Sequence, residues 1–398
     1  MTSAIIARMR TEDMQLQSMA ETSPSKWHLA HTTWFFETFV LKHVDGYRQF
    51  HDRYEYLFNS YYNSIGEQFS RPERGLLSRP GVEEIFHYRE YVDDAMEGLF
   101  ERGQSADFTD VILLGINHEQ QHQELILTDI KHAFSQNPLY PALIEHKPLL
   151  DSREAIPVDF QAFPGKVRMV GHDAINGDFS FDNESPRHAV HVAPFRIATR
   201  PVTNAEYLEF IENGGYLDPL LWLSDGWSRI KQSGQSCPAY WVKLDDGWFE
   251  YTLSGLVPIQ KNQPVCHVSY YEACAFASWA GCRLPSEFEW EVAAQDLSCR
   301  GNNLSLDVLH PLPASEDGLT QMFGDIWEWT SSAYGAYPGF KPDHSALGEY
   351  NGKFMCGQYV LRGGSCASPP GHVRATYRNF FYPDSYWQFS GIRLATDN

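Results

Sequence analysis

The sequence predicts an α+β protein of two domains, in which a helical N-terminal domain precedes an irregular domain of short strands and compact helices. The chain has 398 residues, more than one hydrophobic core usually serves. Residues 1 to about 145 carry apolar positions at helical spacing, whereas the second half alternates short apolar runs with many glycines and prolines. A proline-punctuated stretch without pattern separates them. We therefore expect domains at 1–145 and 166–398, joined by a linker at 146–165.

Two helices of the N-terminal half have the clearest signals. Ser23 and Pro24 suit the N-cap and first position of a helix. The positions that follow on one face are Trp27, Ala30, His31, Trp34, Thr38 and Leu41. A second long helix is expected over about 107–132, and further helices at the N-terminus and around 81–101, which together would form a four-helix bundle.

The second half contains recognisable helix starts. Three pairs fit the capping box, in which a Ser or Thr is followed three residues later by Glu: Thr203 with Glu206, Ser269 with Glu272, and Ser286 with Glu289. Gly214 and Gly281 stand where the first two of these helices should end. The result is an irregular α+β domain.

The charge balance excludes some classes of partner. A formal net charge of -20 and a pI near 5.2 disfavour nucleic acid and anionic membrane surfaces. The N-terminus lacks the apolar core of a signal peptide, and no apolar run reaches the roughly 20 residues of a membrane span. We therefore expect a cytoplasmic protein. The seven cysteines include no zinc-type CxxC pair, and we expect reduced thiols.

The strongest chemical signal is the run His118-Glu119-Gln120-Gln121-His122. Histidines four apart on a helix present two imidazoles from one face to one metal ion. His31, on the inward face of the earlier helix, could supply a third imidazole across a bundle, although a lone histidine on such a face is more often a core residue. Three imidazoles suit Fe(II), zinc or copper about equally, and HExxH is also the zinc-peptidase signature. The residues alone therefore leave redox chemistry and hydrolysis both open.

A family resemblance distinguishes between them. The segments WHLAHTTWFFE, FNSYY and NHEQQHQE resemble the DinB-like domain of the sulfoxide synthases of ergothioneine biosynthesis. The segments PVTNAEYLEFIENGGY, GDIWEWTSS, LRGGSCAS and GIRLA resemble the formylglycine-generating-enzyme (sulfatase-modifying factor) domain, a variant of the C-type lectin fold. The resemblance covers nearly the whole chain and implies an enzyme with these two domains in this order.

The resemblance implies Fe(II) as cofactor, O2 as co-substrate, and His31, His118 and His122 as the iron ligands. It implies that hercynine, the trimethylated betaine of histidine, is one substrate. The FNSYY loop resembles that of the cysteine-using bacterial subgroup, so free cysteine is the expected sulfur donor, with a related thiol as the alternative. Gln121 would hydrogen-bond the substrate imidazole. Asn379, Phe380 and Phe381 would hold the rest of hercynine, with aromatic faces for the quaternary ammonium. Asn379 would bind the carboxylate or cap the site with a neutral hydrogen bond, and core packing is the alternative for both phenylalanines.

The long loop between the second and third helices carries the other expected site residues. In the subgroup whose loop reads FNSYY, one of Tyr61 and Tyr62 would be the catalytic proton or hydrogen-atom donor. Arg71 and Arg74 would clamp the carboxylate of the sulfur donor, since a guanidinium fork matches a carboxylate. A solvated loop charge is the alternative for both arginines.

Three alternatives stay open at this point. A selenoneine synthase would couple a selenosugar to the same imidazole, although Arg71 favours an amino-acid donor. A zinc hydrolase using HExxH and a non-catalytic DinB-like metal-binding protein are the others. Formylglycine generation itself is not expected, because that activity needs two cysteines five apart and Cys366 is followed at that spacing by Gly371.

Overall fold

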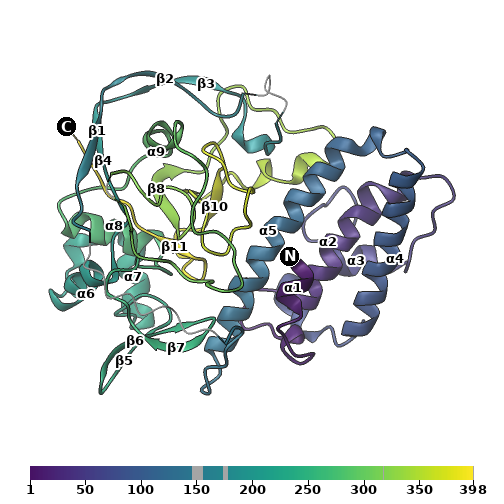
Figure 1. The fold of residues 1–398 in the computed structure, drawn as a ribbon, viewed down its shortest axis with the longest axis horizontal. Coiled ribbons are helices and arrows are strands. Elements are labelled where there is room, and N and C mark those ends of the chain that lie inside the picture. Colours follow the sequence, from purple (N-terminus) through teal and green to yellow (C-terminus); the bar gives the residue numbers. More distant parts are fainter. Residues whose placement is uncertain (146–155, 174–177, 317, 398) are drawn as a thin grey trace. The chain divides into compact units, whose positions relative to one another are not determined.

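The computed structural model describes residues 1–145, 156–173, 178–316 and 318–397, and divides into two compact units (Figure 1). One unit comprises Met1–Leu139 and Pro342–Asn351, and the other comprises Tyr140–Lys341 and Gly352–Asn398. The segment 342–351 therefore belongs to the N-terminal unit, although 200 residues separate it from the helices in sequence. Among the described residues, no helix has both the length and the apolar composition needed to cross a bilayer.

The first unit is helical. Its α-helices are α1 (Thr2–Ile6), α2 (Ser25–Phe39), α3 (Tyr54–Phe58), α4 (Val82–Glu101) and α5 (Thr109–Ser135). Helix α2 lies against α3, α4 and α5 (Figure 1), and every residue from Ser25 to Phe35 is buried. The predicted start of α2 is wrong by a residue or two: the helix begins after Pro24, and the Ser23 side chain does not cap it. Leu41 lies beyond the end of α2.

A glycine brings α2 and α5 close together near the histidines. A Cβ atom added at Gly115 would lie 2.7 Å from the ring of Phe36 and 3.0 Å from the ring of Phe35. The first distance is shorter than real Cβ contacts and the second is tighter than most, so a larger residue here would have to displace these rings. Gly115 precedes His118 by less than one helical turn, and the close approach of the helices therefore brings His118 toward α2.

The second unit contains the sheets. Its strands are β1 (Phe160–Phe163), β2 (Lys166–Val170), β3 (His188–Val192), β4 (Phe195–Ala198), β5 (Trp241–Leu244), β6 (Gly247–Thr252), β7 (Gly255–Pro258), β8 (Trp327–Ala333), β9 (Tyr359–Arg362), β10 (Asn379–Phe381), β11 (Ser390–Gly391) and β12 (Ala395–Asp397). They form sheets of order β1-β4-β12, β10-β9-β8-β11, β2-β3 and β5-β6-β7. The pairings are antiparallel except for β11 with β8.

The helices of the second unit are α6 (Asn204–Glu212), α7 (Ser224–Ser233), α8 (Tyr270–Trp279) and α9 (Glu287–Ala294). The three predicted capping boxes are confirmed at the starts of α6, α8 and α9. Gly214 and Gly281 follow the ends of α6 and α8 with positive φ, as predicted. Residues 146–155 of the predicted linker lie outside the described residues, and the rest of it contains β1, which pairs with β4.

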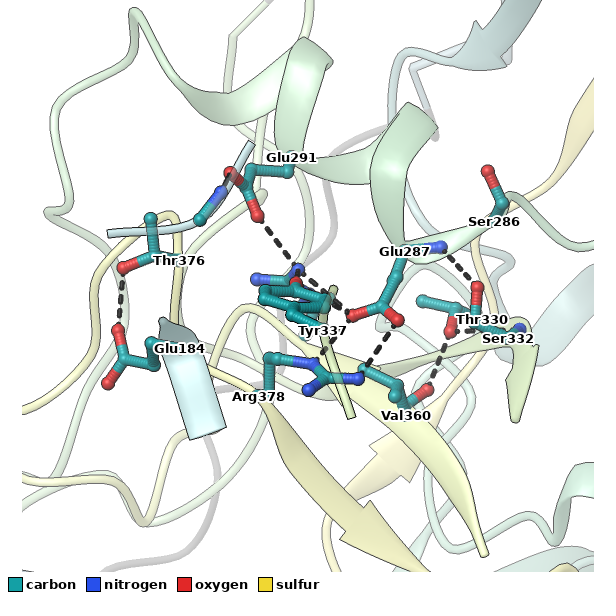
Figure 2. A network of polar contacts seen from close by, with 12 residues as sticks. Glu184, Ser286, Glu287, Glu291, Thr330, Ser332, Tyr337, Val360, Thr376 and Arg378 are labelled. Atoms are coloured by element: carbon teal, nitrogen blue, oxygen red, sulfur yellow. Dashed lines mark hydrogen bonds and ion pairs between the residues drawn. The ribbon is translucent and has the colours of Figure 1, made fainter. Parts of the chain in front are cut away.

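A buried ion network fastens β10 to α9. Figure 2 shows Glu287 of α9 accepting hydrogen bonds from both Arg378 and Tyr337. Arg378 Nε donates to Glu287 at 2.8 Å, and both side chains are almost fully buried. Removing one partner of such a pair would leave an uncompensated buried charge, which typically costs about 3–5 kcal/mol. Arg378 directly precedes Asn379, so the network fixes the position of β10 within its unit.

Candidate metal centre and its surroundings

Three histidines meet in the helical unit. His31 comes from α2, while His118 and His122 come from successive turns of α5, and one ligand nitrogen of each lies within 4.8 Å of the others. The Nε2 atoms of His31 and His118 are 3.2 Å apart. Two nitrogens bound to one metal at about 2.1 Å would be separated by roughly 3.0–3.4 Å. The spacing of this pair therefore fits a shared metal ion.

The other ring nitrogens have different surroundings. Nδ1 of His31 lies 2.6 Å from the carbonyl oxygen of Phe58. Nδ1 of His122 lies 2.7 Å from Nδ1 of His28, whose Nε2 in turn lies 3.0 Å from Asp129. Nδ1 of His118 is buried and has no hydrogen-bond partner among the described residues. The contacts of His31 and His122 leave their Nε2 atoms for a ligand.

Burial keeps the three imidazoles neutral. Burial, and next the neighbouring His28, lowers the pKa of His118 to about 3. Burial is also the main cause of the pKa values of His31 and His122 lying well below the usual range, followed by the nearby His118. A metal binds the neutral form of histidine, so these side chains do not have to lose a proton before they bind one.

Aromatic rings enclose the side of the cluster formed by α2. The ring of Trp27 stacks on His31 with centroids 4.7 Å apart, and Trp34 stacks on His31 at 5.6 Å. Arg74 also lies over the Trp27 ring, with its guanidinium carbon 3.4 Å from the ring centre. Trp27 therefore contacts both a candidate metal ligand and a buried arginine.

The structure separates the two predicted arginines. Arg71 is exposed, and its guanidinium donates to the carbonyl oxygen of Glu21. Arg74 is 2% exposed and donates to the hydroxyls of Ser23 and Ser60. Within the described part of the chain Arg74 forms no ion pair, and its Nε has no partner. Burial, and next the charge of Arg71, lowers the pKa of Arg74 to about 8.

The tyrosine pair lies beside the same aromatic rings. The rings of Tyr61 and Tyr62 stack with their centroids 4.6 Å apart, and the ring centroids of Tyr62 and Trp34 are 5.7 Å apart. Tyr62 is fully buried. Burial, with the neighbouring Tyr61 and Tyr350, raises its pKa well above the usual range, so the Tyr62 phenol stays protonated.

Gln121 contacts a residue that is remote in sequence. Its Oε1 accepts a hydrogen bond from the hydroxyl of Tyr350, whose ring lies 5.6 Å from that of His118 and 6.3 Å from that of Tyr61. Glu349 accepts from the backbone N–H groups of Asn63 and Ser64 at 3.0 and 2.8 Å. Hydrogen bonds thus join the segment 342–351 to the loop that carries Tyr61 and Tyr62 (residues 59–66, the tyrosine loop). The segment also lies next to the histidines.

The remaining predicted residues lie in the other unit. Asn379, Phe380 and Phe381 form β10, paired with β9, and each is partly exposed. Phe380 stacks on Tyr334 with centroids 4.0 Å apart. The side-chain oxygen of Asn379 accepts from the backbone N–H of Phe380. Within its unit, β10 therefore offers a pair of stacked aromatic rings beside an amide.

The glutamate of the HExxH motif does not have the surroundings of a peptidase base. Both oxygens of Glu119 accept from Arg89, at 2.7 and 2.9 Å, and one also accepts from Thr2. A general base needs an oxygen that can take a proton from water at the metal. The ion pair with Arg89 occupies both oxygens, which argues against the zinc-hydrolase alternative.

Sequence reasoning missed four residues of this site. His28 and Asp129 stand on the same helices as the ligands, and the signal was present in the spacing of His28 three residues before His31. Glu349 and Tyr350 gave no such signal, because no pattern in 342–351 indicates contact with a helix more than 200 residues earlier.

Comparisons with known proteins give a consistent family. The family of sulfatase-modifying factor enzyme 1-like domains matches residues 154–305 and 298–398. A hercynine oxygenase of Mycolicibacterium smegmatis is 37% identical over 71% of this chain and 71% of its own length. A hercynine oxygenase of Mycolicibacterium thermoresistibile is 34% identical over 94% of this chain and 87% of its own. Ergothioneine biosynthesis protein 1 of Schizosaccharomyces pombe is 30% identical over 54% of this chain and 27% of its own.

Proposed function

The chain belongs to the hercynine oxygenase family, and we propose on this basis that it is an O2-dependent, non-haem iron(II) sulfoxide synthase of ergothioneine biosynthesis. The reaction would form a carbon–sulfur bond between cysteine and the imidazole of hercynine. The observation that carries the proposal is the buried cluster of His31, His118 and His122, whose spacing fits one metal ion. The DinB-like character of the helical unit is part of this proposal.

The cluster is suited to a redox metal with open coordination positions. Three neutral imidazoles from two helices would hold Fe(II), which when bound would supply the activation of O2 that the oxygenase reaction requires. Trp27 and Trp34 flank His31 and exclude water from that side. The protein would thereby hold the ligands in place before the metal arrives.

Arg74 is the better placed of the two arginines to bind the sulfur donor. A buried cation without an anionic partner is costly, and the carboxylate of cysteine would supply that partner. The fork of a guanidinium matches a carboxylate. Arg71, which is exposed and bonded to a backbone carbonyl, would contribute by its charge and by fixing the turn that carries Arg74.

One of Tyr61 and Tyr62 would supply the proton. A phenol whose pKa is raised by burial stays protonated until a strong base forms beside it, and Tyr62 meets that description. Transfer of its proton as the carbon–sulfur bond forms would favour this reaction over simple oxidation of the thiol. Tyr61 stacks on Tyr62 and would serve as the alternative donor.

Four further residues would bind hercynine. The Gln121 amide would hydrogen-bond the imidazole, with its oxygen oriented by Tyr350. Phe380 and Phe381 would offer aromatic faces to the trimethylammonium group, and Asn379 would bind the carboxylate. The ion pair of Arg378 with Glu287 supports this role because it holds β10 in place.

Anaerobic reconstitution with Fe(II), followed by O2, hercynine and a panel of donors, tests the proposal. We expect one iron per chain and a hercynine–cysteine sulfoxide by mass spectrometry. The panel should include γ-glutamylcysteine and a selenosugar, because product from the selenosugar alone would identify a selenoneine synthase instead. Retention of iron and activity by the His118→Ala protein would refute the ligand assignment.

A further inference from the structure

One buried histidine beside the candidate ligands has not been given a role in the proposed reaction. His28 is 3% exposed and lies on α2 one turn before His31. Its two ring nitrogens have different partners: Nδ1 contacts Nδ1 of His122 at 2.7 Å, and Nε2 contacts Asp129 Oδ2 at 3.0 Å. A neutral imidazole has one donor and one acceptor, so the two contacts together constrain where its proton lies.

The direction of this hydrogen-bond chain follows from its acidic end. Oδ2 of Asp129 already accepts the backbone N–H of Ser23 at 2.8 Å, which marks it as an acceptor. Nε2 of His28 must then be the donor, and Nδ1 of a neutral His28 is left as an acceptor. Nδ1 of His122 must therefore carry a hydrogen and donate it to His28. This leaves the lone pair of His122 on Nε2, the nitrogen that the contact with His28 leaves available for a metal.

We infer that His28 and Asp129 are positioning residues that fix the tautomer and the ring orientation of His122. In many metal sites a carboxylate or a backbone carbonyl accepts directly from the ligand histidine. His31 follows that arrangement through the carbonyl of Phe58. For His122 the carboxylate of Asp129 does not accept directly from the ligand but orients it through His28, which stands between them. The inference rests on the proposed metal site, and it adds two residues that do not touch the metal.

Four variants of the protein test the hydrogen-bond chain from His122 through His28 to Asp129. His28→Phe removes both polar atoms, whereas His28→Gln keeps an amide oxygen that can accept from His122 and an amide N–H that can donate to Asp129. Asp129→Leu removes the acidic end. The double variant His28→Phe/Asp129→Leu tests whether Asp129 acts through His28. Thr33→Val is the matched control, because Thr33 is buried on α2 and its hydroxyl bonds, among the described residues, only to the backbone of Leu29.

The readout is metal binding by the apo protein. Co(II) affinity and the Co(II) absorption bands report on ligand geometry, Fe(II) affinity is measured anaerobically against a chromogenic chelator, and thermal unfolding of the apo protein reports on stability. We expect His28→Phe and Asp129→Leu each to weaken binding by about 10- to 100-fold and to shift the Co(II) bands. The double variant should bind no more weakly than His28→Phe, since residues that act in series are not additive. His28→Gln and Thr33→Val should bind close to wild type.

The inference is overturned if His28→Phe binds as tightly as Thr33→Val, or if His28→Gln loses as much affinity as His28→Phe. Additive losses in the double variant would overturn the part assigned to Asp129. Failure of the wild-type protein to bind either metal would refute the proposed iron site itself. If the wild-type protein binds metal and the His28 and Asp129 variants bind it equally well, the roles of His28 and Asp129 are refuted and the metal site stands.

Discussion

Arg71 and Arg74 stand in one short helical turn, Arg71–Leu76, yet only Arg74 is removed from water. A charge-assisted hydrogen bond to a carboxylate is worth about 1.5–3 kcal/mol, which corresponds to a factor of roughly 10 to 150. We expect Arg74→Ala to raise the apparent KM for the sulfur donor by about that factor. Steady-state kinetics with each substrate varied in turn provide the measurement.

Arg71→Ala is the matched control for this prediction. Removal of an exposed charge should change the KM for the donor much less, because solvent screens it. The KM for hercynine serves as an internal reference in both variants. A larger effect on the donor from Arg71→Ala than from Arg74→Ala would reverse the assignment of the two arginines.

His372 gives the second unit a defined acid sensitivity. Burial, and next the charge of Arg374, lowers its pKa to about 3, whereas an exposed imidazole has a pKa of about 6.5. Below pH 6.5 the unfolded chain therefore binds a proton that the folded chain does not bind, so stability falls as pH falls from 6.5 toward 3. The loss at pH 5 amounts to about 2 kcal/mol.

We expect His372→Gln to remove this part of the pH dependence. Urea unfolding at pH 7 and pH 5 measures it, and the exposed His191 of β3 offers the control variant His191→Gln. Equal losses between the two pH values in wild type and His372→Gln would show that His372 titrates normally in the folded protein.

At the scale of elements, the tyrosine loop is held by hydrogen bonds within itself, and the residue before it bonds to a candidate metal ligand. The buried Asn59 side chain accepts from the N–H of Tyr62 at 3.0 Å and donates to the carbonyl oxygen of Tyr62 at 2.9 Å. The preceding residue, Phe58, accepts from His31. The loop thus holds both phenols at a fixed place relative to α2.

This arrangement predicts how the reaction divides between products. Tyr62→Phe, or Tyr61→Phe if that phenol is the donor, should lower sulfoxide formation by about 10²- to 10⁴-fold, while O2 consumption continues into cysteine sulfinate. Mass spectrometry with an oxygen electrode measures the partition. Tyr56→Phe, at an exposed position of α3, is the control. A wild-type ratio of sulfoxide to sulfinate in both single variants and in the double variant would mean that the loop is structural.

The segment 342–351 depends on one acidic side chain. Glu349 accepts two backbone N–H groups of the tyrosine loop and the hydroxyl of Ser64. Glu349→Ala should therefore speed amide hydrogen exchange in both 342–351 and 61–66, since the lost bonds join the two segments. Glu349→Gln, which retains an acceptor oxygen, should have a smaller effect. Faster exchange in 342–351 alone would mean that the bonds to Glu349 do not order the tyrosine loop.

The sequence predicted the elements better than their long-range partners. The capping boxes of α6, α8 and α9 were found because each lies within four residues of chain, whereas the start of α2 was misplaced because the cap of Ser23 was inferred without its partner Arg74. The histidine cluster followed from helical spacing together with a family resemblance. Tyr350 and the hydrogen bond between His28 and Asp129 depend on contacts between distant segments, which no local pattern encodes.

At the scale of the whole molecule, the chain passes between the two units at three points: 139–140, 341–342 and 351–352. We therefore expect the short segment 342–351 to share the stability of the helical unit and not that of the flanking strands. The chain runs from β8 into this segment and from the segment on to β9.

Metal binding should make this division measurable. A ligand that binds only the folded state at 100 times its dissociation constant stabilises by about 2.7 kcal/mol, which slows exchange through unfolding by about 100-fold. We expect Co(II) or Fe(II) to slow the most protected amides of α2 and α5, and those of 342–351 with them, while β8 and β9 change little. Hydrogen exchange with mass spectrometry, with and without metal, gives the comparison, and His118→Ala is the control that should show no metal effect. Protection of β8 and β9 to the same degree as α2 would mean that the two units unfold as one, and protection of α2 without 342–351 would separate that segment from the helical unit.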